Sequence, residues 1–270
     1  MICLSMTGMG QFNSTLFGGQ IPVANQITNV ASIYSCATLD PISTNNSSSA
    51  TVTFASSTTT TGSTGTGSSW QNVSSFGAGE IIYTMLYNGS DIYAGTMGGK
   101  IYKSTNNGTS WTVINTGMNV GYIWSLNVTA NIIFAATEQG VYAYNGSTWT
   151  LTSLSGKDVH ALTSVNGIIY AATWGYGVYK STNNGSTWTQ INNGLGAFLA
   201  MQSITSTSNG DVYAGTVGGG VFKTTDGTNW TQLTCGYNVI WAMSSTSTAV
   251  FAGTYGGGLF NQLMAVQAGQ

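Results

Sequence analysis

Charge is the scarcest property of this 270-residue sequence, which contains five Lys, seven Asp and Glu together, one His and no Arg. Charged residues make up 4% of the chain, whereas they make up about 25% of an average globular domain. With a net charge of −2 and no guanidinium group, the chain cannot build a cationic groove for nucleic acid. Phosphoryl transfer also lacks its usual cations. We therefore expect no nucleic-acid partner.

Long apolar runs are also missing, because no stretch approaches the 18 consecutive apolar residues of a membrane span. The composition is nevertheless 42% hydrophobic and 11% aromatic, which is enough for a buried core, so the low charge does not indicate disorder. The polar surface must then come from Ser, Thr, Asn and Gly. Such a surface repels its own copies only weakly. This predicts an extracellular or cell-surface protein that assembles with itself or carries glycans.

Cysteine is rare, with three residues in the chain. Cys3 and Cys36 could close a loop in an oxidising compartment and leave Cys235 as a buried thiol. Three unpaired buried thiols fit the sequence equally well. None of the three belongs to a Cys-x-x-Cys pair or lies beside a second His, so we expect no metal site and no cofactor.

The chain changes character near residue 67. Residues 1–55 contain apolar β-type clusters without a repeat and predict an extended arm, and residues 56–67 are a Ser/Thr/Gly-rich linker. From residue 68 to 262 the sequence repeats about every forty residues, and residues 263–270 form a tail. The repeats end on Trp70, Trp111, Trp149, Trp188 and Trp230.

Each repeat predicts three short strands joined by Gly- and Asn-rich turns, followed by a fourth strand that starts at the Trp. Four strands per forty residues describe one blade of a β-propeller. The last three-strand set, 240–260, is followed by no Trp strand, while the strand at Trp70 is preceded by no repeat. The sequence therefore predicts an all-β, five-bladed propeller of four-stranded blades, closed by the Trp70 strand, with an extended N-terminal β arm.

The turns before two of the tryptophans, Ser104–Trp111 and Ser181–Trp188, read Ser-Thr-Asn-Asn-Gly-x-x-Trp. They resemble the Asp-box, or bacterial neuraminidase repeat, of secreted β-propellers, with Asn106 and Asn183 in place of the Asp. The resemblance implies a structural hairpin in which the Asx side chain caps the turn and the Trp packs between sheets. The turns at Trp149 and Trp230 are shorter, and the resemblance is specific for the fold and not for sialidase activity.

Sialidase chemistry would require a cluster of three arginines, which this chain cannot supply. Asp91 and Asp211 occupy the same turn in different repeats, which indicates turn chemistry rather than catalysis. Glu138 and Asp158 are the only remaining pair of acids near plausible loops, and they are a weak candidate for glycosidase carboxylates. We therefore predict a non-enzymatic protein with no catalytic residue.

Two rings of aligned positions should open on one mouth of the central channel, where differences between repeats could form a ligand site. The candidate ligand-binding residues, which include aromatic rings suited to stacking on sugars, are Tyr83, Trp124, His160, Trp174, Trp241 and Tyr255. Channel packing or a protein contact is the favoured alternative use of this mouth. We expect His160 to be a hydrogen-bonded ring member rather than a general base, because the motif places no orienting carboxylate beside it.

An arm of apolar strands with unpaired edges must be covered, either by its own propeller or by a neighbouring copy to which it donates a strand. A head-to-tail contact that does not close propagates into a filament. The leading hypothesis is thus a structural homopolymer. The alternatives are a carbohydrate-binding lectin or adhesin and a viral or phage appendage protein.

Asn-x-Ser/Thr triplets are frequent and suggest a glycoprotein. Composition and Asn-Gly turns also generate such triplets by chance, and Asn72 and Asn229 next to Trp strands could be buried. The remaining glycosylation candidates are Asn13, Asn45, Asn46, Asn88, Asn107, Asn127, Asn145 and Asn184.

Overall fold

The computed structural model describes residues 26–32, 47–53, 73, 76 and 79–263. The chain divides into two compact units, residues 1–70 and 71–270. In the first unit, strands β1 (Gln26–Ser32) and β2 (Ser47–Thr53) pair antiparallel, with Val30 opposite Ser49. Part of the predicted β arm is therefore a two-stranded ribbon. Cys3, Cys36, Asn13, Asn45, Asn46, Trp70 and Asn72 lie outside the described residues.

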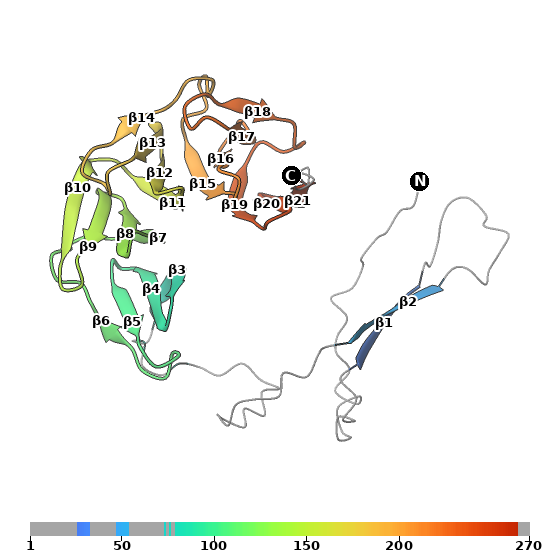
Figure 1. The fold of residues 1–270 in the computed structure, drawn as a ribbon, viewed down its shortest axis with the longest axis horizontal. Coiled ribbons are helices and arrows are strands. Elements are labelled where there is room, and N and C mark those ends of the chain that lie inside the picture. The colour runs from blue at the N-terminus through green and yellow to red at the C-terminus, as the bar shows by residue number, and fades with distance from the viewer. Residues whose placement is uncertain (1–25, 33–46, 54–72, 74–75, 77–78, 264–270) are drawn as a thin grey trace. The chain divides into compact units, whose positions relative to one another are not determined.

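The second unit is a five-bladed β-propeller made of five antiparallel sheets that follow one another around a common axis (Figure 1). Blade 1 contains β3 (Ile81–Asn88), β4 (Asp91–Met97), β5 (Ile101–Ser104) and β6 (Thr112–Val113); blade 2 contains β7 (Ile123–Thr129), β8 (Ile132–Thr137), β9 (Gly140–Tyr144) and β10 (Trp149–Ser155). Blade 3 contains β11 (Val159–Val165), β12 (Ile168–Thr173), β13 (Gly177–Ser181) and β14 (Thr189–Gln190); blade 4 contains β15 (Met201–Ser206), β16 (Val212–Thr216), β17 (Val221–Thr224) and β18 (Thr231–Leu233). Blade 5 contains β19 (Ile240–Ser245), β20 (Ala249–Thr254) and β21 (Gly258–Leu263).

The core lies between the blades, and it explains why each second strand ends in small residues. The second strands of blades 2, 3 and 4 are covered on both faces, as the continuous burial of β16 shows. A Cβ atom on Gly95 would lie 2.4 Å from Cγ2 of Ile123 on the next blade, and one on Gly215 would lie 2.6 Å from Cγ2 of Ile240. Neighbouring sheets therefore approach too closely at these points for a larger side chain.

The turns that precede the tryptophans are held by Asx side chains. Oδ1 of Asn106 accepts a hydrogen bond from the backbone N–H of Ser110 at 2.9 Å, and Asn183 does the same for Thr187. Oδ1 of Asp226 accepts hydrogen bonds from two successive backbone N–H groups, and this hydrogen bonding holds the pKa of its carboxyl below the usual range. An amide thus caps this turn as a carboxylate does, which is the structural use expected of these positions.

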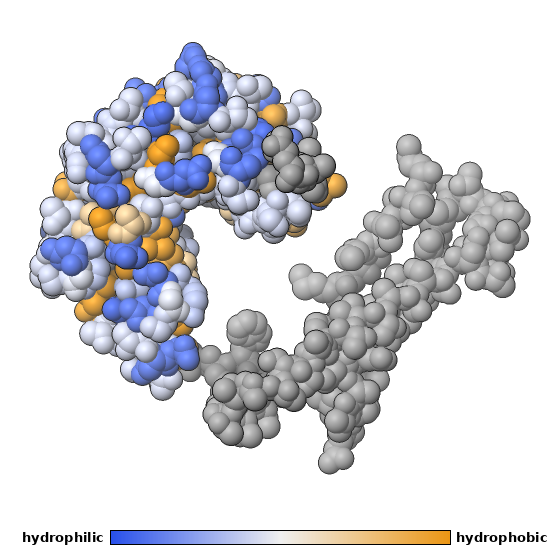
Figure 2. Space-filling view, in the orientation of Figure 1, coloured by the Kyte–Doolittle hydropathy of each residue, from blue (hydrophilic) through white to orange (hydrophobic). Residues whose placement is uncertain are grey.

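The five blades form an arc with an opening between blade 5 and blade 1 (Figure 2). Within the described residues blade 5 has three strands, and β21 is its outermost strand. Closure of the ring by a strand at Trp70 falls outside the described residues.

Candidate functional site

Every blade has a β-bulge at the same place in its first strand. In each blade the register between the first and second strands shifts at one residue, and that residue is Tyr83, Trp124, His160, Gln202 or Trp241. These are the five positions that the sequence repeats align. Because an extra unpaired residue re-aims its side chain, the bulges explain why these positions differ in kind from the apolar residues beside them.

Four aromatic rings from blades 2 and 3 pack in one column. Tyr122 and Trp124 are parallel with centroids 4.7 Å apart, Trp124 and His160 are 5.0 Å apart, and His160 and Trp174 are 5.1 Å apart at 19°. The ring of Tyr83 lies 5.0 Å from Trp124 in a tilted arrangement. The faces of the rings inside the column are therefore covered by neighbouring rings. Trp174, at the end of the column, is 42% exposed.

Hydrogen bonds fix this column. Asp158 accepts a hydrogen bond from Nε1 of Trp124 at 3.0 Å and lies 3.2 Å from Nε2 of His160. Nδ1 of His160 lies 3.1 Å from Oε1 of Gln202 on blade 4. The prediction that no carboxylate stands beside His160 is wrong, because the turn before β11 folds Asp158 back onto the ring two residues later.

Glu138 and Asp158, the candidate glycosidase carboxylates, both make structural hydrogen bonds. The two carboxylate oxygens of Glu138 accept the backbone N–H groups of Gly121 and Tyr122 at 2.6 and 3.1 Å. Asp158 instead holds Trp124 and His160. Each acid thus positions one part of the aromatic column. The sequence repeats did not predict Tyr122 or this role of Asp158. Both residues lie immediately before an aligned first strand, and this shared position was the pattern that indicated them.

The candidate ligand residues form two groups rather than one continuous surface. Trp124, His160 and Trp174 belong to the aromatic column, and Tyr83 packs against it. Trp241 and Tyr255 form a separate tilted pair on blade 5, with centroids 6.2 Å apart, and both are exposed. The column is therefore an aromatic site held in place by ring contacts and hydrogen bonds, while the second pair lies on blade 5 at the end of the arc.

Two ion pairs outside the aromatic column occupy equivalent positions of blades 1 and 4. Lys103 lies 2.8 Å from Asp91, and Lys223 lies 2.8 Å from Asp211. The hydrogen bond from Lys103 lowers the pKa of the Asp91 carboxyl, and a hydrogen bond from Lys100 lowers that of Glu80. These acids brace turns, as expected from their repeated positions.

The glycosylation candidates within the described residues differ in access. Asn107, Asn145, Asn184 and Asn229 are exposed, so the expectation that Asn229 could be buried is wrong. Asn88 and Asn127 are half-buried, and the side-chain oxygen of Asn127 is buried without a hydrogen-bond partner. Cys235 is a free thiol.

Across the described ranges, no three His, Cys, Asp or Glu side chains gather as a metal site would require. The same part of the chain has no helix long and apolar enough to cross a membrane.

Solved structures of low sequence identity share this architecture. The chain aligns with the extracellular domain of a hybrid two component system from B. thetaiotaomicron at TM-score 0.59 and 21% identity, covering 72% of this chain and 28% of that one. It aligns with an ancestral GH74 enzyme at TM-score 0.56 and 23% identity, covering 68% and 28%. These likenesses show a β-propeller fold. YCF48 from Cyanidioschyzon merolae aligns at TM-score 0.53 and 13% identity, covering 70% and 68%.

The chain spans little more than a quarter of the first two of these proteins. No family model and no curated protein matches the sequence. The Asp-box resemblance therefore remains a prediction, while the propeller itself is confirmed.

Proposed function

We propose that this chain is a non-enzymatic, extracellular structural protein that assembles with copies of itself through its N-terminal arm. The observation that carries the proposal is the pair of apolar sheet faces at the two ends of the arc. Strand register places Met85 and Tyr87 on the face of blade 1 that points away from blade 2. These side chains are 63% and 68% exposed.

Blade 5 presents a matching face. Leu259 pairs with Gly253 and Leu263 with Ala249, on the side of the sheet opposite to the side that packs on blade 4. The two leucines are 71% and 75% exposed. Exposed apolar faces, and an outer strand that pairs on one side only among the described residues, invite another chain. The arm offers such strands, since β1 and β2 already have β conformation.

The composition supports an extracellular polymer. A surface with few charges has little repulsion between copies, and glycans on the exposed Asn107, Asn145 and Asn184 would keep it hydrated. Because a head-to-tail contact is heterologous, it produces a filament unless it closes into a ring. A viral or phage appendage would use the same assembly.

Removing residues 1–67 tests the arm. We expect the shortened chain to fold as a propeller and to form no filaments by negative-stain microscopy, whereas the full chain forms them. A variant that keeps residues 1–55 but replaces linker residues 56–67 by a Gly/Ser segment of equal length is the matched control and should still assemble. Undiminished fibres from the shortened chain would overturn the proposal.

Carbohydrate binding is the second candidate, and the exposed end of the aromatic column favours it. One face of the Trp174 indole packs on His160, and the side chain remains 42% exposed at the end of the column. A surface with few charges suits a neutral glycan, since a flat indole stacks on the apolar face of a sugar ring.

Replacing Trp174 by alanine should then weaken glycan binding by about tenfold or more, corresponding to the loss of one aromatic contact. Titration of an array-selected neutral oligosaccharide by calorimetry measures this change. Tyr87→Ala is the matched control, because it removes an exposed aromatic ring that is not among the candidate ligand-binding residues and should leave the affinity unchanged. A broad array on which the intact chain binds nothing would remove this candidate.

A further inference from the structure

The turn before the Trp of a blade also covers part of the preceding blade. In blade 3, a Cβ on Gly185, the third residue before Trp188, would lie 3.3 Å from Cε1 of Phe134 on blade 2. In blade 4, a Cβ on Gly227 would lie 2.6 Å from the hydroxyl oxygen of Tyr170 on blade 3. Phe134 and Tyr170 occupy the same position of the second strands, β8 and β12. At these two seams the turn of one blade therefore lies against an aromatic ring of the blade before it.

At the seam of blades 3 and 4 the turn also binds a lysine. Tyr170 pairs with Lys180 across strands β12 and β13. Nζ of Lys180 donates to the carbonyl oxygen of Gly227 at 2.8 Å and to the hydroxyl oxygen of Thr228 at 3.2 Å. A carbonyl group and a neighbouring hydroxyl group of blade 4 therefore satisfy the ammonium group of blade 3.

The seam of blades 1 and 2 has the same ring and the same lysine without this cover. Tyr93 pairs with Lys103 across strands β4 and β5, in the register of the corresponding pair of blade 3. The turn of blade 2 is shorter than those of blades 3 and 4. No atom lies within 4 Å of the Cβ position of Gly146, the third residue before Trp149. This turn therefore does not reach the ring of Tyr93.

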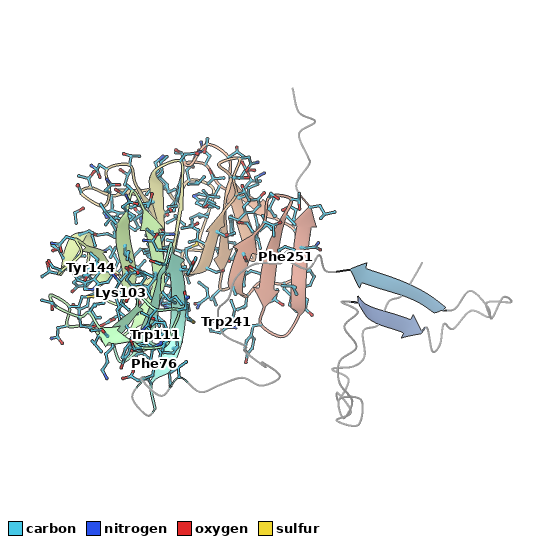
Figure 3. All side chains as sticks on the ribbon, turned by 60° about the horizontal axis from the view of Figure 1, so that its bottom comes forward. Phe76, Lys103, Trp111, Tyr144, Trp241 and Phe251 are labelled. Atoms are coloured by element: carbon cyan, nitrogen blue, oxygen red, sulfur yellow. The ribbon has the colours of Figure 1, made fainter. Side chains whose placement is uncertain are left out.

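A pocket of about 260 Å³ lies where the turn is short. Its walls include Asn88, Tyr93 and Lys103 from blade 1 and Asn131 and Tyr144 from blade 2. Figure 3 shows Lys103 and Tyr144 near one another on these neighbouring blades. A cavity of about 150 Å³ accommodates a benzene molecule in another protein, so this pocket has room for one substituted sugar ring.

The charge of Lys103 in this pocket is already balanced. Its Nζ lies 2.8 Å from Oδ2 of Asp91, but an ammonium group has three N–H donors and can still donate to a ligand. Burial raises the pKa of the Tyr93 hydroxyl, which therefore stays neutral. Asn88 and Asn131 add side-chain amides, each with a donor and an acceptor. These walls suit a neutral ligand with several hydrogen-bonding groups better than an anion, which Asp91 would repel.

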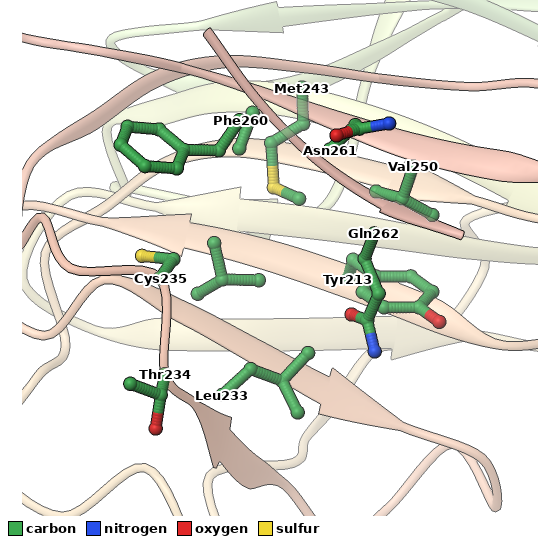
Figure 4. Close-up of a pocket in the computed structure, with 11 residues that line it drawn as sticks. Tyr213, Leu233, Thr234, Cys235, Met243, Val250, Phe260, Asn261 and Gln262 are labelled. Carbon is green, nitrogen blue, oxygen red and sulfur yellow. The ribbon is translucent and has the colours of Figure 1, made fainter. Parts of the chain in front are cut away.

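The cavity between blades 4 and 5 has different chemistry. It measures about 370 Å³, and its walls include Leu233, Met243, Val250 and Phe260 (Figure 4). These side chains are apolar, and Phe260 belongs to β21, the last strand among the described residues. Of the two cavities, the polar pocket between blades 1 and 2 is therefore the one suited to a hydrogen-bonding ligand.

We propose that the pocket between blades 1 and 2 binds one N-acetylated sugar. The acetamido carbonyl and a neighbouring hydroxyl group accept hydrogen bonds from Lys103, as the carbonyl and hydroxyl groups of the blade 4 turn accept them from Lys180. The sugar ring packs against Tyr93, and its other hydroxyl groups bond to the amides of Asn88 and Asn131. A peptide with a carbonyl beside a hydroxyl shares part of this chemistry, but it has fewer hydroxyl groups for the two amides.

The pocket is separate from the aromatic column. Tyr122 and Trp124 of the column lie at the start of strand β7, whereas Asn131 of the pocket follows the end of this strand. Binding in the pocket therefore requires neither the exposed face of Trp174 nor assembly through the N-terminal arm.

Saturation-transfer NMR with N-acetylglucosamine tests the pocket, and because it observes the ligand it works on a monomer or a filament. The full chain is produced without N-glycans, since the glycosylation candidates Asn88 and Asn145 both line the pocket. We expect a saturable signal that is strongest at the acetamido methyl group. Glucose, which lacks the acetamido group, should bind about tenfold or more weakly because it cannot supply the carbonyl that Lys103 binds.

Two variants locate the sugar. Asn131→Gly removes an amide without straining the backbone, because Asn131 has a positive φ of 62°, and it should weaken binding about fivefold. Asn166→Gly is the matched control, since Asn166 has φ of 53° in the corresponding hairpin of blade 3, and its affinity should be unchanged. Lys103→Met should weaken binding about tenfold or more. Circular dichroism and the unfolding midpoint report whether each variant folds.

Four results would overturn the proposal. The first is no saturation transfer up to the solubility limit of N-acetylglucosamine, and the second is equal affinity of Asn131→Gly and Asn166→Gly. The third is tighter binding of an acetylated Gly-Thr dipeptide amide, which would make the occupant a peptide. The fourth is loss of binding in Trp174→Ala, which would place the sugar at the aromatic column and support the second candidate function instead.

Discussion

Replacing Gly194 by alanine is expected to lower the free energy of unfolding by about 3–5 kcal/mol, a loss reached only by severe single substitutions. Two effects combine at this position. Gly194 has a φ of +92°, which an L side chain rarely adopts. The added Cβ would also lie 2.0 Å from the backbone oxygen of Trp230. That oxygen belongs to Trp230, which is buried immediately before β18, and it cannot move aside without displacing the Trp.

Gly196→Ala separates the two effects. Gly196 is two residues away and has a φ of +59°, but no atom lies within 4 Å of its Cβ position. Only the backbone strain remains there, so the expected loss is about 1–2 kcal/mol. Urea unfolding of both variants measures the difference as a shift in midpoint at constant slope. Equal midpoints for the two variants would show that the approach of Trp230 does not constrain Gly194.

The blade repeat was readable from the sequence because it depends on local chemistry. Alternating apolar residues, Gly and Asn at turns, and a Trp every forty residues are each sufficient to place a strand or a turn. The five aligned positions at the channel were also predicted, since residues such as Trp124 and His160 occupy the same place in successive repeats. The turns at Asn106 and Asn183 form as expected because an amide oxygen accepts backbone hydrogen bonds as a carboxylate does.

The arrangement of the site depended on contacts between blades, which a repeat alignment does not contain. The bulge at each first strand becomes visible only when both strands are paired. Asp158 reaches Trp124 because blades 2 and 3 are adjacent, so the acid that looked like a weak catalytic candidate positions an aromatic column instead. The exposed apolar faces at the two ends of the arc also depend on how the sheets assemble, because the sequence does not distinguish Met85 and Leu259 from other strand residues.

Contacts between blades also carry most of the stability, and Trp230 shows how much one of them contributes. Its indole is 4% exposed and packs in a cluster with Ile191, Leu195 and Phe222. Truncation to alanine would remove this packing, leave a cavity at the seam of blades 3 and 4, and deprive the Ile191 carbonyl of its donor. We expect Trp230→Ala to lower the free energy of unfolding by about 3–5 kcal/mol.

Trp241→Ala is the control, because the same truncation there removes an indole that is 51% exposed on blade 5 and should cost about 1 kcal/mol or less. Trp230→Phe refines the result: it restores part of the apolar burial but not the hydrogen bond to Ile191, so its stability should lie between those of the parent chain and the alanine variant. Hydrogen exchange should show the loss first at β14 and β18, the strands on either side of the seam. A Trp230→Ala chain as stable as Trp241→Ala would mean that the indole of Trp230 does not join blades 3 and 4.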